Sequence, residues 1–226
     1  MKYSNITKGI FKDRPNRFIA RVEVNGDLQI CHVKNTGRCR ELLIPGAEVF
    51  LEESQNPNRK TKYDLVAVWK AGRLFNIDSQ APNKVFGEWL DSCNHFGNIT
   101  YVKPEFKFKN SRFDFYAETN TEKILIEVKG VTLEEDGVLL FPDAPTERGV
   151  KHISELIRAK EEGFRTAVAF VIQTDYARFF TPNNKTHPQF GDVLKTALDK
   201  GVEIIALCCD VTPDTLNIKD YVPVEI

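Results

Sequence analysis

Hydrophobic and polar residues alternate in short segments along roughly the first 80 residues, which is the pattern of β-strands with one buried face. Turn pairs such as Gly26-Asp27 separate these segments, which are residues 17–24, 28–34, 47–53, 63–70 and 73–78. The tight turns and the lack of a helical period predict five strands that close into a small barrel of the OB type. An SH3-like barrel would produce a similar pattern and stays open as an alternative.

From about residue 81 the pattern changes, because helical periods and longer apolar runs appear. The runs 166–173 and 202–209 are apolar throughout, as expected for strands that are covered on both faces of a sheet. Thr146 is a candidate N-cap for a helix over 147–162. The other predicted elements are helices over 83–92, capped by Asn83, and 188–200, and strands over 99–108, 112–118 and 123–129. We predict a two-domain α/β (α+β) protein, with the barrel over residues 1–80 and a mixed sheet flanked by helices over 81–226.

The charge distribution separates the same two parts. Residues 1–80 hold 14 Lys and Arg against 9 Asp and Glu, whereas residues 81–226 hold 17 against 23. A basic first part suits a polyanion, although a solvated charged surface explains the excess equally well. No apolar run is long enough for a membrane span, and the five cysteines form no CxxC pair. These features predict a cytoplasmic protein that has no membrane contact.

Charged residues interrupt an otherwise apolar stretch in ILIEVK, residues 124–129. In a strand, Glu127 and Lys129 share the face of Leu125, and in an internal strand that face is covered. The preceding stretch RFDFY puts Asp114 on one face and Phe113 and Phe115 on the other. In a hairpin, Asp114 can lie beside Glu127, and the two carboxylates repel each other unless a cation joins them.

A hard dication with oxygen ligands, Mg²⁺ or Mn²⁺, would resolve this repulsion, with Asp114 and Glu127 as its ligands. Lys129 would then orient the attacking water and neutralise charge that develops on a phosphate. The spacing of Asp114, Glu127 and Lys129 and their order along the chain resemble the PD-(D/E)XK nuclease superfamily, although Phe113 stands where the motif has proline. That resemblance makes Glu88 a candidate third acid, with Glu105 as a second option. The alternative is an edge strand on which Glu127 and Lys129 are merely solvated.

Four longer segments are more distinctive: HVKNTGRCRELLIPG, SRFDF, EVKGVTL and FPDAPTERGVKHISELIRAKEEG. They resemble the sugar fermentation stimulation protein A family over nearly the whole chain. The resemblance implies an OB-like domain followed by a restriction-endonuclease-like domain, a cytoplasmic location and DNA as the partner. It does not by itself imply nuclease activity, which is inferred from the acids and the lysine.

The resemblance carries over to individual residues of this chain. Asp114, Glu127 and Lys129 match the family's candidate catalytic triad, and Asp143, as a loop acid, is expected to face the scissile phosphate. Arg148 and Lys151 suit phosphate binding. His152 is expected on the same nucleic-acid-binding surface, as a structural residue, a partner that supports the site or a proton donor. Further nucleic-acid contacts are expected in the barrel, at His32, Asn35, Thr36, Arg38 and Arg40, with Arg59, Lys60 and Tyr63 extending the surface and Trp69 in the barrel core. The chain departs from the family pattern at Gln173-Thr174-Asp175 and at His187-Pro188.

Three functions remain open from the sequence. The first is a Mg²⁺-dependent DNA nuclease, and the second is a non-catalytic DNA-binding regulatory protein involved in sugar metabolism. The third is a small-molecule enzyme, which the basic barrel and the absence of a phosphate-binding glycine loop disfavour. The sequence does not fix the oligomeric state, and a homodimer is one possibility that it leaves open.

Overall fold

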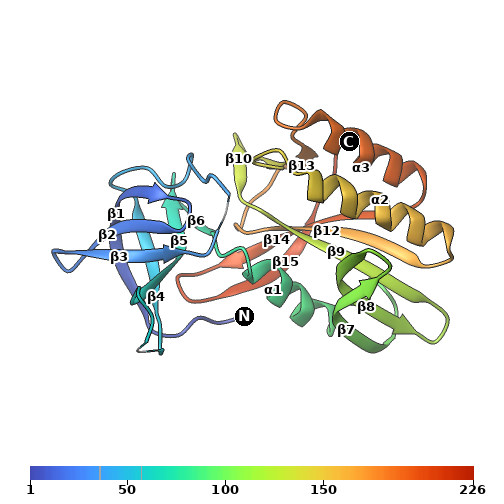
Figure 1. Ribbon diagram of the computed structural model, residues 1–226, viewed down its shortest axis with the longest axis horizontal. Coiled ribbons are helices and arrows are strands. Elements are labelled where there is room, and N and C mark those ends of the chain that lie inside the picture. Colours follow the sequence, from blue (N-terminus) through green and yellow to red (C-terminus); the bar gives the residue numbers. More distant parts are fainter. Residues whose placement is uncertain (36, 57) are drawn as a thin grey trace.

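The computed structural model of the chain describes residues 1–35, 37–56 and 58–226. It consists of a β-barrel, formed by the first third of the chain, beside a larger sheet that carries helices on both faces (Figure 1). Among the described helices, none combines the length and the apolar character that a membrane crossing requires.

The described residues of the first part form a six-stranded sheet: β1 (Ile6–Asn16), β2 (Ile19–Val24), β3 (Asp27–Val33), β4 (Glu48–Glu53), β5 (Tyr63–Lys70) and β6 (Arg73–Asn76). They follow the order β3-β2-β1-β4-β5-β6, and a parallel pairing of β3 with β5 closes β1–β5 into a ring. The predicted OB-like barrel is therefore confirmed. Its interior is apolar because alternate residues such as Ala20, Val22 and Val24 on β2 point inward.

Strand β1 was not expected from the pattern, although it lies at the centre of this sheet. Its alternation is hidden by a glycine and several charges. Gly9 is needed at its position, because a Cβ atom there would lie 2.5 Å from Cγ1 of Val22 on β2. Because β1 and β2 approach each other closely here, β1 has a glycine where an apolar side chain would have made the strand recognisable in the sequence.

The second sheet has the order β15-β14-β12-β9-β8-β7. Its strands are β7 (Ile99–Phe108), β8 (Ser111–Thr119), β9 (Lys123–Val131), β12 (Arg165–Ile172), β14 (Glu203–Val211) and β15 (Leu216–Val222). The three central strands β9, β12 and β14 are parallel and the outer ones antiparallel, so the predicted mixed sheet is confirmed. Helix α1 (Ala81–Leu90) packs on one face, and α2 (Glu147–Glu161) and α3 (Pro188–Asp199) pack on the other.

Several details differ from the sequence prediction. Helix α1 begins at Ala81 after Gln80, so Asn83 lies inside its first turn and does not cap it. A small sheet formed by β10 (Leu133–Glu135), β11 (Val138–Phe141) and β13 (Phe179–Pro182) was not predicted, since its strands are too short for periodicity to show. Strand β15, in which charged residues interrupt the apolar ones, was also missed.

The predicted cap of α2 is present, because Thr146 accepts a hydrogen bond from the Gly149 amide.

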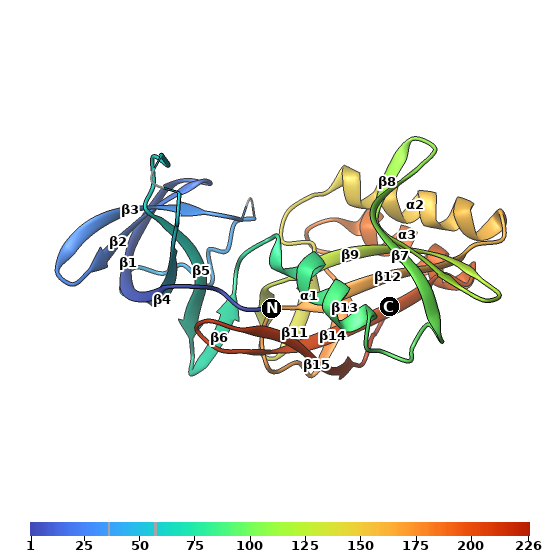
Figure 2. The same cartoon turned by 90° about the horizontal axis from the view of Figure 1, so that it is seen from below.

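Hydrogen bonds join the barrel to the second sheet at the end of β12. The Asn76 amide donates to the Gln173 carbonyl at 2.9 Å, and Nε2 of Gln173 donates to Oδ1 of Asn76 at 2.7 Å. The Thr174 hydroxyl donates to the Leu74 carbonyl at 3.1 Å. Gln173 and Thr174, where the chain departs from the family pattern, are therefore buried in this junction. Figure 2 shows β6 of the barrel next to the second sheet.

Candidate metal and nucleic-acid site

Strand β9 holds Glu127 and Lys129 at the middle of the second sheet, between β8 and β12. Ile124, Ile126 and Val128 belong to the core under α1, whereas Leu125 belongs to the core under α2. Because side chains alternate along a strand, Glu127 and Lys129 lie on the α2 side. The glutamate side chain is only 2% exposed and the lysine 15%, so both charges are largely withdrawn from water.

The two oxygens of Glu127 have different surroundings. Oε1 pairs with the Lys129 ammonium and with Nδ1 of His152, whereas buried Oε2 has no hydrogen-bond partner among the described residues. Burial opposes ionisation of this carboxyl, but the hydrogen bond from His152 and the charge of Lys129 outweigh it and lower its pKa. Glu127 is therefore an ionised buried group with one oxygen free for a ligand.

Asp114 lies next to this carboxylate. Its Oδ1 accepts a hydrogen bond of 2.7 Å from Nδ2 of Asn83, and its Oδ2 accepts one of 2.7 Å from the Val128 amide. Burial, followed by repulsion from Glu127, raises the pKa of Asp114 to about 6. The two acids thus converge as the hairpin argument predicted. An unpartnered buried oxygen beside a second carboxylate fits a hard dication, for which oxygen is the preferred ligand.

The strand around Asp114 is not regular. Phe113 packs in the core under α2 and Phe115 in the core under α1, so the prediction that they share a face is wrong. The neighbouring strand β7 is also irregular at this level, since Glu105, between the paired residues Pro104 and Phe106, adopts φ 54°. At this irregular position, the Asp114 carboxylate accepts its hydrogen bond from the Val128 amide on β9.

Helix α2 supports the pair of acids from the other side. Nε of Arg148 donates to Nε2 of His152 at 3.3 Å, one helical turn along, and His152 in turn contacts Glu127. Lys151 points elsewhere, since its ammonium reaches the Asn110 carbonyl in the β7–β8 turn at 3.4 Å. The structure therefore connects Arg148 and His152 with Glu127, and it leaves Lys151 at the rim.

Neither candidate third acid is hydrogen-bonded to Asp114 or Glu127. Glu88 is half exposed and binds the N-terminal amino group of Met1 at 2.6 Å, while Glu105 pairs with Arg112 at 2.7 Å. The residue of α1 that binds Asp114 is Asn83. The sequence prediction missed this contact because it assigned Asn83 as the helix cap. Within the described part of the chain, no three His, Cys, Asp or Glu residues are grouped so that they could hold a metal ion.

Two of the barrel residues expected at a nucleic-acid interface are bound to a buried acid instead. The Arg59 guanidinium forms two hydrogen bonds with Asp64, at 2.6 and 2.8 Å, and Nδ1 of His32 lies 3.0 Å from the same carboxylate. Lys60 is exposed, and Thr36 lies outside the described residues. Tyr63 is buried, whereas Trp69 is 38% exposed, so the expectation that Trp69 lies in the core is wrong.

The loop after β3 carries Asn35, Arg38 and Arg40, which were expected to contact nucleic acid. It is held in place by Arg14, which was not among the predicted site residues. The Arg14 guanidinium donates to the carbonyl oxygens of Asn35, Gly37 and Arg38 and of Arg17 on the neighbouring turn, at 2.6–2.9 Å. The side-chain amide of Asn35 binds the Ile77 carbonyl. The two arginines on either side of Pro15-Asn16, in DRPNR at 13–17, are the signal that could have pointed to this region.

The same loop contacts the second sheet's domain through Asp143. Oδ2 of this acid accepts a hydrogen bond of 2.8 Å from the Arg38 amide. A Cβ atom on Gly37 would lie 2.5 Å from that oxygen, so glycine is required for the contact. Asp143 was expected to face the scissile phosphate, and in the structure one of its oxygens binds the barrel loop.

Comparisons with known proteins agree with this two-part architecture. Residues 13–77 match the family model described as SfsA N-terminal OB domain, and residues 80–215 match the one described as Sugar fermentation stimulation protein RE domain. Curated relatives named sugar fermentation stimulation protein homolog include one from Desulfitobacterium hafniense strain DCB-2, which is 58% identical and matches 100% of this chain and 99% of its own length. Another, from Clostridium beijerinckii, is 57% identical and matches 99% of both chains.

A solved structure, titled as that of Pyrococcus furiosus SfsA in complex with Ca²⁺, superimposes with a TM-score of 0.90. It is 29% identical in sequence, and the match covers 100% of this chain and 98% of that one. Both domain models and the full-length relatives lead to the same assignment. This chain belongs to the sugar fermentation stimulation protein family.

Proposed function

We propose that this protein is a divalent-metal-dependent nuclease that binds DNA and hydrolyses its phosphodiester bonds. The observation that carries the proposal is the unpartnered, buried Oε2 of Glu127, which lies beside Asp114 while Lys129 binds the other oxygen of Glu127. A structural ion pair would satisfy its own oxygens. This cluster instead leaves an acceptor buried and free, at the cost that such an atom carries.

Asp114 and Glu127 are the residues that would hold Mg²⁺ or Mn²⁺. The bound ion would supply charge neutralisation at the phosphate and a more acidic water. A family relative from Pyrococcus furiosus was solved with Ca²⁺, another hard dication that prefers oxygen ligands, and this supports the choice of metal.

The protein's own residues supply the remaining functions. Lys129, next to the acids and partly open to solvent, would orient the attacking water and neutralise negative charge that develops on the phosphate. Nδ1 of His152 holds Glu127 in place, and Arg148 on the exposed side of α2 is a candidate phosphate contact. Asn83 and the Val128 amide fix the direction of the Asp114 carboxylate.

Metal binding and cleavage can be tested separately. We expect calorimetric titration to show that the wild type binds Mg²⁺ or Mn²⁺ and that Asp114→Asn and Glu127→Gln bind it much more weakly. Incubation with nicked, single-stranded and branched DNA should give Mg²⁺-dependent products with the wild type. The nuclease proposal is wrong if none of these substrates is cut, whatever the titration shows.

A second candidate, a non-catalytic DNA-binding regulator of sugar metabolism, is favoured by one observation. In the described part of the chain only two acids converge, with no third acidic ligand beside them. This function predicts DNA binding that weakens with salt and is unchanged in Lys129→Ala. Binding without cleavage by the metal-loaded wild type would favour the regulator over the nuclease.

A further inference from the structure

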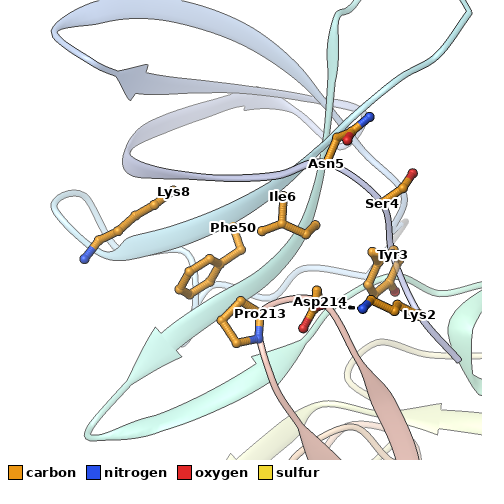
Figure 3. A pocket seen from close by; sticks show the side chains of 9 residues that line it. All are labelled: Lys2, Tyr3, Ser4, Asn5, Ile6, Lys8, Phe50, Pro213 and Asp214. Atoms are coloured by element: carbon orange, nitrogen blue, oxygen red, sulfur yellow. Dashed lines mark ion pairs between the residues drawn. The ribbon is translucent and has the colours of Figure 1, made fainter.

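Two of the surface cavities that border the barrel differ in charge balance. The cavity in Figure 3 lies between the barrel, represented by Ile6 and Phe50, and the β14–β15 turn, and its volume is about 720 Å³. There the Lys2 ammonium pairs with the Asp214 carboxylate at 3.4 Å, and Lys8, which also lines the cavity, pairs with Glu48 at 2.5 Å, so both lysine charges are offset. The other cavity, of about 290 Å³, has arginine as its most frequent lining residue: Arg14, Arg17, Arg38 and Arg40.

In this second cavity, which we call the arginine cavity, the backbone is held in place by hydrogen bonds and positive charge is in excess. Arg14 binds four carbonyl oxygens and so holds together the two segments that carry the other three arginines. Arg17, Arg38 and Arg40 are exposed, and among the described residues none has a carboxylate within ion-pairing distance. Three like charges that line one cavity repel one another, and an anion placed between them removes that repulsion.

We infer that the arginine cavity binds a phosphate group, and specifically the terminal phosphate of a nucleic-acid strand. The guanidinium fork matches phosphate oxygens in geometry, and its charge does not vary with pH in the physiological range. A terminal phosphate monoester carries a charge of about −1.5 to −2. An internal phosphodiester carries one negative charge, and such charges repeat along the backbone. Arginines that converge on one cavity suit the more highly charged end; arginines spread along a groove would suit the backbone.

The cavity is also connected to the candidate metal site. Its loop is tied through the Arg38 amide to Asp143, which lies three residues before the α2 cap Thr146, and α2 contributes His152 to Glu127. A strand end anchored in the cavity would therefore be held in a defined position relative to the acids. The identity of the ligand as nucleic acid rests on the proposed function, whereas the affinity for phosphate does not.

The experiment compares three copies of one single-stranded oligonucleotide, with a 5′-phosphate, a 3′-phosphate or no terminal phosphate, by fluorescence anisotropy in EDTA. We expect the wild type to prefer one phosphorylated end by about tenfold or more, the value of one charge-assisted hydrogen bond. Arg17→Gln/Arg40→Gln should lose this preference. Lys195→Gln/Lys200→Gln, which removes two exposed charges on and just after α3, should retain it.

Inorganic phosphate tests the cavity without nucleic acid. It should raise the melting temperature of the wild type and of the α3 control variant more than that of Arg17→Gln/Arg40→Gln. If no oligonucleotide binds but phosphate still shows this difference, the cavity stands as a phosphate site and the proposed function falls. Equal affinity for all three oligonucleotides, or a preference that survives in Arg17→Gln/Arg40→Gln, overturns the assignment to a strand end.

Discussion

Two acids in this protein, Asp64, which is buried in the barrel, and Asp114, which is half-buried in the second sheet, have opposite electrostatic surroundings. Asp64 contacts the side chains of Arg59, His32 and Lys34, the last at 3.3 Å. Burial disfavours the ionised form, but these partners outweigh it and lower the pKa of Asp64 to about 2. Burial and the charge of Glu127 disfavour ionisation of Asp114 and raise its pKa to about 6. The Val128 amide, the charge of Lys129 and the Asn83 side chain favour ionisation but do not outweigh them.

The difference separates a structural cluster from a candidate functional one. Asp64 is compensated by its own protein and needs no ligand. Asp114 and Glu127 are incompletely compensated, so the folded state retains a cost that a bound cation would remove. Perturbed acids of this second kind gather at functional sites more often than balanced ones do.

The largest effect should follow from removing the lysine next to the acids. Lys129→Ala should lower the rate of Mg²⁺-dependent DNA cleavage by about 10²–10⁴-fold, the range for loss of a group that acts on the transition state. Lys123→Ala is the matched control, since Lys123 lies on the same strand but is exposed at its other end. Single-turnover rates of the two variants, measured on one substrate, provide the check. Equal rates for both would remove Lys129 from the reaction.

The next largest effect should be on stability, and it should occur in the barrel. Asp64→Asn leaves Arg59 and His32 without their charged partner and removes one of the three carboxylates around Lys34, and we expect the free energy of unfolding to fall by about 2–3 kcal/mol. Asp13→Asn is the control, because Asp13 forms the same type of pair with Arg21 at the surface. Urea unfolding of both variants measures the difference. If Asp13→Asn lowers stability as much as Asp64→Asn, burial of the pair does not matter.

The same cluster predicts a pH dependence. The pKa of Asp64 is about 2 in the folded protein, below its usual value of about 3.9 in an unfolded chain. A depressed folded pKa gives stability that is present above the unfolded pKa and is lost as the pH falls toward the folded one. The contribution, about 2 kcal/mol, should therefore disappear between about pH 4 and pH 2. Urea midpoints should fall more steeply over this range for the wild type than for Asp64→Asn, and parallel curves would contradict the assignment.

The two acids also differ in how well the sequence predicted them. The alternation in ILIEVK was enough to place Glu127 and Lys129 on one buried face, and the SRFDF hairpin brought in Asp114. The cluster at Asp64 could not be foreseen, because its partners come from β3 and two separate loops whose meeting depends on barrel closure. The contact from Asn83 to Asp114 was missed for a local reason, because the predicted start of α1 was wrong by two residues and made Asn83 the helix cap.

The smallest expected effect decides most directly between the two kinds of acid. In EDTA, Asp114→Asn removes a half-buried charge that is repelled by Glu127, and Asn83 can turn its side-chain amide to keep a hydrogen bond to the new asparagine. We therefore expect the free energy of unfolding to stay the same or to rise by about 1 kcal/mol, opposite in sign to the effect of Asp64→Asn. Added Mg²⁺ should raise the melting temperature of the wild type, since the ion binds only the folded state, and should leave that of Asp114→Asn unchanged. If Asp114→Asn instead loses as much stability as Asp64→Asn, then Asp114 is a structural acceptor, its place near Glu127 needs no cation, and the contrast between the two acids disappears.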